Sequence, residues 1–227
     1  MQFITGFLLG MVLSVQALAL DIGSLSNADA VGGLKDALTQ GSAAAVSQLG
    51  VENGFLGNAK VKILLPDALK KIQGGLRLLG MQKQTDELIT AMNRAAEQAV
   101  PEAKTLLVGA IQNMSVQDAK GILTGGDTSA TDYFRRATSE QLTQKFLPIV
   151  TQATSKVGLA EKYNNLAAQG AKLGLLDAKQ TNIENYVTQK ALDGLFLMIG
   201  EKEKAIRKDP LGAATGMAQK VFGLLGK

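Results

Sequence analysis

The stretch "YVTQKALDGLFLMIGEKEKAIRKDP", residues 186–210, decides what kind of fold this chain adopts. Its apolar residues recur every three or four positions, which places them on one face of a helix. This stripe consists of Ala191, Leu195, Met198 and Ala205, with Leu192, Ile199 and Ile206 beside it. Lys202 lies where the stripe leaves the core. An amphipathic helix needs other helices to cover its apolar face, so the stretch indicates a helical bundle.

The composition of the whole chain agrees with this interpretation. The chain has 227 residues, of which 46% are apolar and 4% aromatic, and helix-favouring residues dominate the rest. The segment "AKVKILLP", residues 59–66, alternates like a strand, but a lone strand would have no partner, so we expect an extended connector. We predict one all-α domain over residues 20–227, with seven to nine helices and no significant sheet.

Local signals mark where the helices begin and end. Four capping boxes precede apolar periodic runs, and they start at Ser26, Ser115, Thr138 and Thr181.

The prolines give a second set of boundaries. Pro66 suits the first turn of a helix, and Pro101 falls inside a long helical pattern that it should kink or divide. Pro148 and Pro210 are expected to act in the same way, with Pro210 opening a final helix.

The first twenty residues, "MQFITGFLLGMVLSVQALAL", have the pattern of a secretory signal. The apolar core from Phe7 to Val15 is too short to span a bilayer, and no charged side chain occurs before Asp21. We predict a signal peptide over residues 1–19, cleavage after Ala19 and a periplasmic location. An uncleaved membrane anchor and an N-terminal core helix are the alternatives.

The charged and reactive residues exclude several classes of function. The 24 basic and 20 acidic residues give a net charge of +4, without the dense basic face and stacking aromatics that nucleic-acid binding needs. The chain has no His and no Cys, which excludes disulfides, Ser-His-Asp triads and the usual zinc sites. We predict no cofactor and no metal site, although an all-oxygen Ca²⁺ or Mg²⁺ site is left open.

The stretch "ILTGGDTSATDYFRRAT", residues 122–138, resembles a phosphate-binding loop at first sight. A phosphate loop follows a strand and continues into Lys and Ser or Thr, whereas here a helix precedes the glycines and no Lys follows them. Gly125 or Gly126 fits the left-handed position that ends a helix, and Asp127 or Thr128 would cap the next one. We therefore expect a corner between two helices, whose new N-terminus could hold an anion.

Several long segments resemble a bacterial family known as domain of unknown function 4197. They are "GLKDALTQGSAAAVSQLG" (33–50), "GFLGNAKVKILLP" (54–66), "NRAAEQAVPEAK" (93–104), "DAKGILTGGDTSATDYFR" (118–135), the opening stretch (186–210) and "VFG" (221–223). The resemblance implies an exported, mostly helical protein of Gram-negative bacteria, and it implies no activity.

The polar residues inside these segments are the candidate ligand-binding residues. They are Asn93, Arg94, Glu97, Asp118, Asp127, Thr131, Tyr133, Arg135, Asp193, Glu201 and Arg207. Several of them lie beside apolar stripes, and buried charges must be paired, so we expect Arg–carboxylate bridges that fix how the helices pack. The alternative is a cleft in which the same network binds or cleaves a ligand.

Two functions remain open. The first is a non-catalytic binding or cell-envelope interaction module, in which Arg94, Arg135 and Arg207 neutralise the acids and leave an apolar groove. The second is a carboxylate-based hydrolase of the glycosidase type, which needs two carboxylates within about 10 Å in an open cleft. Its acids would come from Glu97, Asp118, Asp193 or Glu201. The composition alone leaves an enzyme uncertain, and we favour the first function.

The expected partner is a protein or small molecule of the envelope rather than a nucleic acid. A final helix over residues 210–226 has its apolar residues on one side, with lysines flanking it. These apolar residues are Leu211, Ala214, Ala218, Val221 and Leu225. It either docks on the core of the domain or makes a peripheral membrane contact. The oligomeric state is not predicted.

Overall fold

The computed structural model describes residues 27–172 and 182–209, together with residues 216, 219 and 221. In this part of the chain there are eight α-helices, one short 3₁₀ helix and no strand. The elements are α1 (Asn27–Leu49), α2 (Asp67–Leu78), α3 (Gln82–Ala99), η2 (Val100–Glu102), α4 (Ala103–Gln112), α5 (Val116–Thr124), α6 (Ser129–Ser155), α7 (Leu159–Lys172) and α8 (Ile183–Lys208). The prediction of an all-α, single-domain bundle is confirmed.

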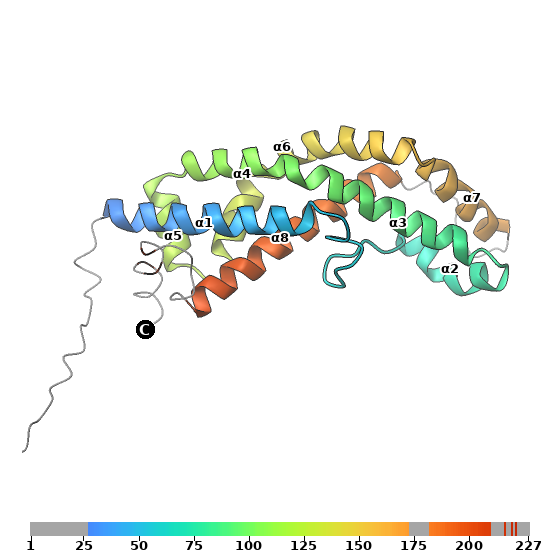
Figure 1. Cartoon of the computed structure of the whole chain (residues 1–227), viewed down its shortest axis with the longest axis horizontal. Coiled ribbons are helices and arrows are strands. Elements are labelled where there is room, and N and C mark those ends of the chain that lie inside the picture. Colours follow the sequence, from blue (N-terminus) through green and yellow to red (C-terminus); the bar gives the residue numbers. More distant parts are fainter. Residues whose placement is uncertain (1–26, 173–181, 210–215, 217–218, 220, 222–227) are drawn as a thin grey trace, which may run out of the picture.

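The helices form an elongated bundle (Figure 1). α3 and α4 follow one another along its length, α5 lies at one end, and α2 and α7 lie at the other. α8 packs most extensively against α6 and also contacts α1 and α3. The apolar stripe of α8 is buried from Ala191 to Ile199, with Leu195 and Ile199 at 0% and 3% exposure, whereas Ala205 near the end of the helix is exposed.

A glycine of α8 brings the α1–α2 loop against the core. Phe55 in this loop is fully buried, and a Cβ atom at Gly194 would lie 2.6 Å from its Cε1 atom. Real Cβ atoms do not approach another heavy atom so closely, so the loop depends on the missing side chain at this position.

The capping predictions had different outcomes. Ser115 forms the predicted capping box with Asp118 at the start of α5. The prediction at Thr138 is wrong, because this residue lies buried inside α6 and its hydroxyl donates to the carbonyl of Phe134 at 2.7 Å. Ser26 and Thr181 lie outside the described residues. At the start of α8, the side chain of Asn182 caps the helix.

The prolines also differ from one another. Pro101 divides the long helical pattern as predicted, since α3 ends at Ala99 and η2 carries the proline before α4 begins. Pro66 is the N-cap of α2 rather than a residue of its first turn. α6 continues through Pro148, so no division occurs there. Pro210 lies outside the described residues.

Residues 62–66 form an extended connector, as predicted, whereas residues 59–61 before them form a turn. Val61, Ile63 and Leu65 are buried, while Lys62 and Leu64 between them are exposed. The side chain of Asn93 makes the hydrogen bonds that the backbone of a neighbouring strand would make. Its amide donates to the carbonyl of Ile63 and accepts from the N–H of the same residue, both at 2.8 Å.

Candidate functional site

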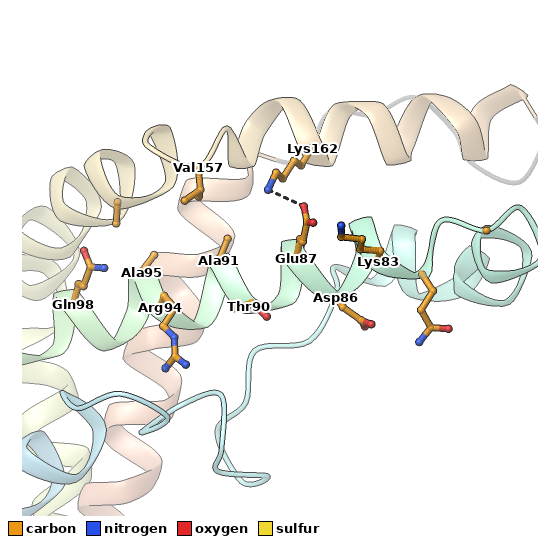
Figure 2. A pocket seen from close by; sticks show the side chains of 13 residues that line it. Lys83, Asp86, Glu87, Thr90, Ala91, Arg94, Ala95, Gln98, Val157 and Lys162 are labelled. Carbon is orange, nitrogen blue, oxygen red and sulfur yellow. Dashed lines mark hydrogen bonds and ion pairs between the residues drawn. The ribbon is translucent and has the colours of Figure 1, made fainter.

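A groove of about 770 Å³ runs between α3 and the junction of α6 with α7 (Figure 2). Its surface is mainly apolar, and its central residues are Ala91 and Ala95 of α3 and Ala153 and Val157 near the end of α6. Figure 2 shows Ala91 and Ala95 on the side of α3 that faces Val157. The groove exists because short side chains stand one helical turn apart on this side, where longer ones would fill the space.

An ion pair bridges the groove. Lys162 of α7 donates to Glu87 of α3 at 3.0 Å, and their side chains are 35% and 43% exposed. Exposed pairs of this kind contribute under about 1 kcal/mol, so the bridge opens at little cost. Lys83, one turn before Glu87, also lines the groove. The site is therefore an apolar channel with a weakly held polar rim.

Arg94 lines the groove, but it mainly supports the fold. Its side chain points away from α7 and donates to Glu97 at 2.6 Å and to Glu52 at 3.1 Å. Glu97 is 5% exposed, and its other oxygen accepts the backbone N–H groups of Phe55 and Leu56, both at 3.0 Å. Glu97 thus holds the α1–α2 loop in place, and both of its carboxylate oxygens accept hydrogen bonds.

A second buried carboxylate belongs to Glu203, which the sequence reasoning missed. It accepts the backbone N–H groups of Ala130 and Thr131 at 2.9 Å, and the Thr131 hydroxyl at 2.8 Å. Arg207 donates to the same carboxylate at 2.9 Å and to the carbonyl of Ile122 at 2.8 Å. Glu203 therefore caps α6 from another helix. The spacing of Glu203 and Arg207, four residues apart, was the available signal for this pair.

Arg135 does not neutralise a buried acid, contrary to the expectation. It lies 3.8 Å from Asp193, and the two side chains are 48% and 42% exposed. Its guanidinium also stacks over the ring of Phe196, 4.7 Å from the centroid. Glu201 pairs on the surface with Lys60, whose hydrogen bond and charge lower the pKa of Glu201.

The remaining candidates belong to helix ends and helix packing. Hydrogen bonds from the side chain and backbone of Ser115 lower the pKa of Asp118. The Tyr133 hydroxyl donates to the carbonyl of Ala110 at 2.7 Å, and burial raises the pKa of Tyr133. Asp127 is exposed in the turn before α6. Thus Asn93, Glu97, Thr131 and Arg207 make internal contacts, and the candidates do not converge on one site.

The corner between α5 and α6 differs in detail from its prediction. Gly125 has φ −86° and ψ −178°, which is extended backbone, and the described glycines with positive φ are Gly80 and Gly158 instead. The close approach of Ser129 requires glycine at position 125, since a Cβ atom there would lie 2.5 Å from the Ser129 hydroxyl oxygen. Thr128 is the N-cap residue by position and makes no side-chain cap. The expected corner is present, but the left-handed glycine is not.

The comparison with family models identifies the chain. The model of "Protein of unknown function (DUF4197)" matches residues 24–223. The chain belongs to the DUF4197 family. This confirms the resemblance found in the sequence, and the family description assigns no activity. No curated protein and no solved structure matches the chain.

The acids that a hydrolase would use do not meet in the groove of this DUF4197 protein or in the cavity beside α8, within the part of the chain that the structure describes. Glu97, Asp118, Asp193 and Glu201 are absent from the lining of the groove. A cavity of about 390 Å³ between the connector and α8 has Asp193 alone of the four in its lining. Among the described residues, no group of three or more acids is placed to hold a metal ion. No helix in this part of the chain has the length and apolar character of a membrane span.

Proposed function

We propose that this DUF4197 protein is a non-catalytic binding protein of the cell envelope, and that its groove receives the apolar chain of a small amphiphile. The observation that carries the proposal is the groove itself. Its volume of about 770 Å³ lies within the range of about 300–1,000 Å³ that small-molecule sites occupy. Its mainly apolar surface suits an apolar chain, and the exposed Lys83 and Lys162–Glu87 pair suit a polar end.

The state of the buried acids also favours binding over catalysis. Glu97 and Glu203 each accept two backbone N–H groups and an arginine. A catalytic carboxylate needs free lone pairs directed at a substrate, whereas these are saturated by the protein.

A fluorescent fatty acid tests the groove directly. The probe is 11-dansylamino-undecanoate, whose emission rises and shifts to the blue in an apolar site. The variant Ala91→Phe places a ring in the groove, and we expect it to weaken probe binding at least about tenfold, because the volume is lost. The matched control is Ala137→Phe, at an exposed position of α6 outside the groove. No binding to the unaltered protein, or equal loss in both variants, would reject the proposal.

Export to the envelope is supported by the signal-like pattern of residues 1–20. Cell fractionation followed by intact-mass measurement checks it. The expected mass is that of residues 20–227, recovered from the periplasmic fraction. Recovery of the full-length chain from the cytoplasm would contradict the envelope assignment and leave the groove proposal standing.

A further inference from the structure

The turn that joins α2 to α3 exposes two leucines at one end of the molecule. Leu78 is 90% exposed and Leu79 is 52% exposed, the first being the most exposed large apolar residue in the described part of the chain. Figure 1 shows this turn at the end of the bundle opposite α5. We call residues 70–85 the α2–α3 tip. Contiguous exposed apolar surface with a polar rim marks interaction sites, and these two leucines are adjacent.

The backbone of the tip holds these leucines outward. Gly80 has φ +73°, the left-handed conformation that ends many helices. The N–H of Met81 donates to the carbonyl of Leu76 at 2.9 Å, and the N–H of Gly80 donates to that of Arg77 at 3.0 Å. These two bonds are the Schellman pattern, which satisfies the last carbonyls of α2. The exposure of Leu78 and Leu79 is therefore built into an ordered turn.

The tip has basic side chains and no acidic ones. Asp67 and Asp86 are the nearest acids on either side in the sequence. Between them lie four exposed basic residues, which form no ion pair within the described part of the chain: Lys70, Lys71, Arg77 and Lys83. The combination of exposed leucines with unpaired cations complements a layer of anionic groups that covers an apolar interior.

A small cavity in the tip supplies further hydrogen-bond donors. It has a volume of about 360 Å³ and lies between α2 and the start of α3. Lys70, Arg77, Gln82 and Thr85 contribute to its lining, and none of its lining residues is acidic. The Thr85 hydroxyl already donates to the carbonyl of Met81, so the donors available to a phosphate group are the two cations and the neighbouring side-chain amides.

We propose that the α2–α3 tip docks this protein on a bilayer that contains anionic phospholipids. Leu78 and Leu79 enter the interfacial region, and Lys70 and Arg77 contact lipid phosphates. The groove lining begins at Gly80 and Lys83, so docking brings one end of the groove to the lipid surface. This last step rests on the proposed function, and it makes the amphiphile a lipid or fatty acid taken from or delivered to the membrane.

Vesicle flotation of the full chain tests the docking. Vesicles of phosphatidylglycerol with phosphatidylethanolamine are compared with vesicles of phosphatidylcholine. We expect binding to the anionic vesicles, weakening as salt rises. The double variant Leu78→Ser with Leu79→Ser should bind at least about tenfold more weakly, because the apolar contact is lost. The matched control is Leu64→Ser with Leu197→Ser, which alters two leucines that are 48% and 44% exposed elsewhere.

A charge variant tests the phosphate contacts separately. Lys70→Gln with Arg77→Gln should bind about tenfold or more weakly and show a smaller salt dependence, since two cations that attract the anionic surface are lost. Lys104→Gln with Lys120→Gln removes two exposed lysines outside the tip and should bind like the unaltered protein.

Three outcomes would overturn the docking proposal. They are no binding of the unaltered protein to anionic vesicles, equal losses in the tip and control variants, and a dimer in sedimentation that only the Leu78–Leu79 variant dissociates. In the last case the tip is a contact between two copies of the chain. Ala91→Phe separates the two proposals, because it should lose the fatty-acid probe and keep vesicle binding.

Discussion

Glu97 and Glu203 are buried carboxylates on two different helices, and the protein neutralises both in the same way. Each carboxylate is buried, and each accepts two backbone N–H groups from a distant segment together with an arginine on its own helix. Burying a charge is costly unless it is paired and its lone pairs are filled, and both conditions are met here. These two acids therefore fix the α1–α2 loop and the start of α6 in place.

The contrast between Glu203 and Glu201 gives the sharpest test at the residue scale. Glu203→Gln removes the charge that balances Arg207, whose side chain is 14% exposed. It also places the NH₂ group of an amide opposite a backbone N–H group, where two donors face each other. We expect a loss of about 3 kcal/mol in the free energy of unfolding, measured by urea denaturation. Glu201→Gln, two residues away, should leave the midpoint unchanged, because the pair with Lys60 is at the surface. Equal effects of the two variants would show that the buried cap does not stabilise the fold.

Arg135 should matter much less than the sequence suggested. The expectation of a buried partner predicts a loss of several kcal/mol for Arg135→Ala. Its actual partner Asp193 is 42% exposed and 3.8 Å away, so we expect under about 1 kcal/mol from the ion pair. The contact with Phe196 adds a similar amount. A drop of more than about 3 kcal/mol in urea denaturation would contradict the exposed position of this pair.

The raised pKa of Tyr133 links stability to alkaline pH. Burial is the main cause, and it favours the neutral phenol in the folded state. This contribution is complete below the ordinary tyrosine value of about 10 and is lost as the pH rises through the folded value. Tyr133→Phe should cost about 1 kcal/mol at pH 8, through the lost bond to Ala110. The difference between the two proteins should shrink above pH 10, as measured by urea midpoints.

At the scale of elements, the sequence was most informative where a signal is local. The Ser115 capping box involves residues three apart, so it could be predicted with its partner Asp118. Thr138 has the same pattern, but α6 begins earlier because Glu203 caps it from more than seventy residues away. A distant cap of this kind leaves no mark in a local window of sequence.

The groove shows the same limit. The short residues Ala91 and Ala95 are visible in the sequence at a spacing of one turn, but such pairs are common on helices. What makes them a site is the position of Ala153 and Val157 opposite them, which depends on how α6 and α7 pack on α3. Of the eleven predicted site residues, Arg94 alone lines this groove.

Two glycines in helices should respond oppositely to alanine. Gly194→Ala drives a methyl group into Phe55 and should cost about 1–3 kcal/mol in thermal or urea unfolding. Gly121 of α5 is exposed and has open space around its missing Cβ atom. Gly121→Ala should stabilise the protein by about 0.5–1 kcal/mol, through helix propensity alone. The idea of close packing at Gly194 fails if both variants become more stable.

At the scale of the whole molecule, the two ends of the bundle differ in how extensively their helices pack on other helices. α8 and α6 pack on each other and on several further helices along the middle of the molecule. α2 packs mainly on α7, and the two lie together at one end (Figure 1). α7 packs on α3, α6 and α8 as well, so α2 is the helix of this end with few packing partners. Because such a helix opens at lower free energy, local unfolding should begin at α2.

Hydrogen exchange followed by mass spectrometry checks this order. Backbone amides of α2 should exchange well before those of Leu195 and its neighbours in α8. Amides of α1, another helix near an end, provide the comparison, since α1 packs on both α8 and α4. Equal protection of α2 and α8 would indicate one uniform cooperative unit.

The connector before α2 has a further consequence for the behaviour of the protein at high concentration. A single extended chain at the surface is a template for pairing with another molecule and hence for fibril growth. Here the Asn93 side chain forms hydrogen bonds with both the backbone N–H and the carbonyl of Ile63. The Tyr186 hydroxyl donates to the carbonyl of the next residue, Leu64. The two side chains thus occupy backbone groups of Ile63 and Leu64 that amyloid-like stacking would require.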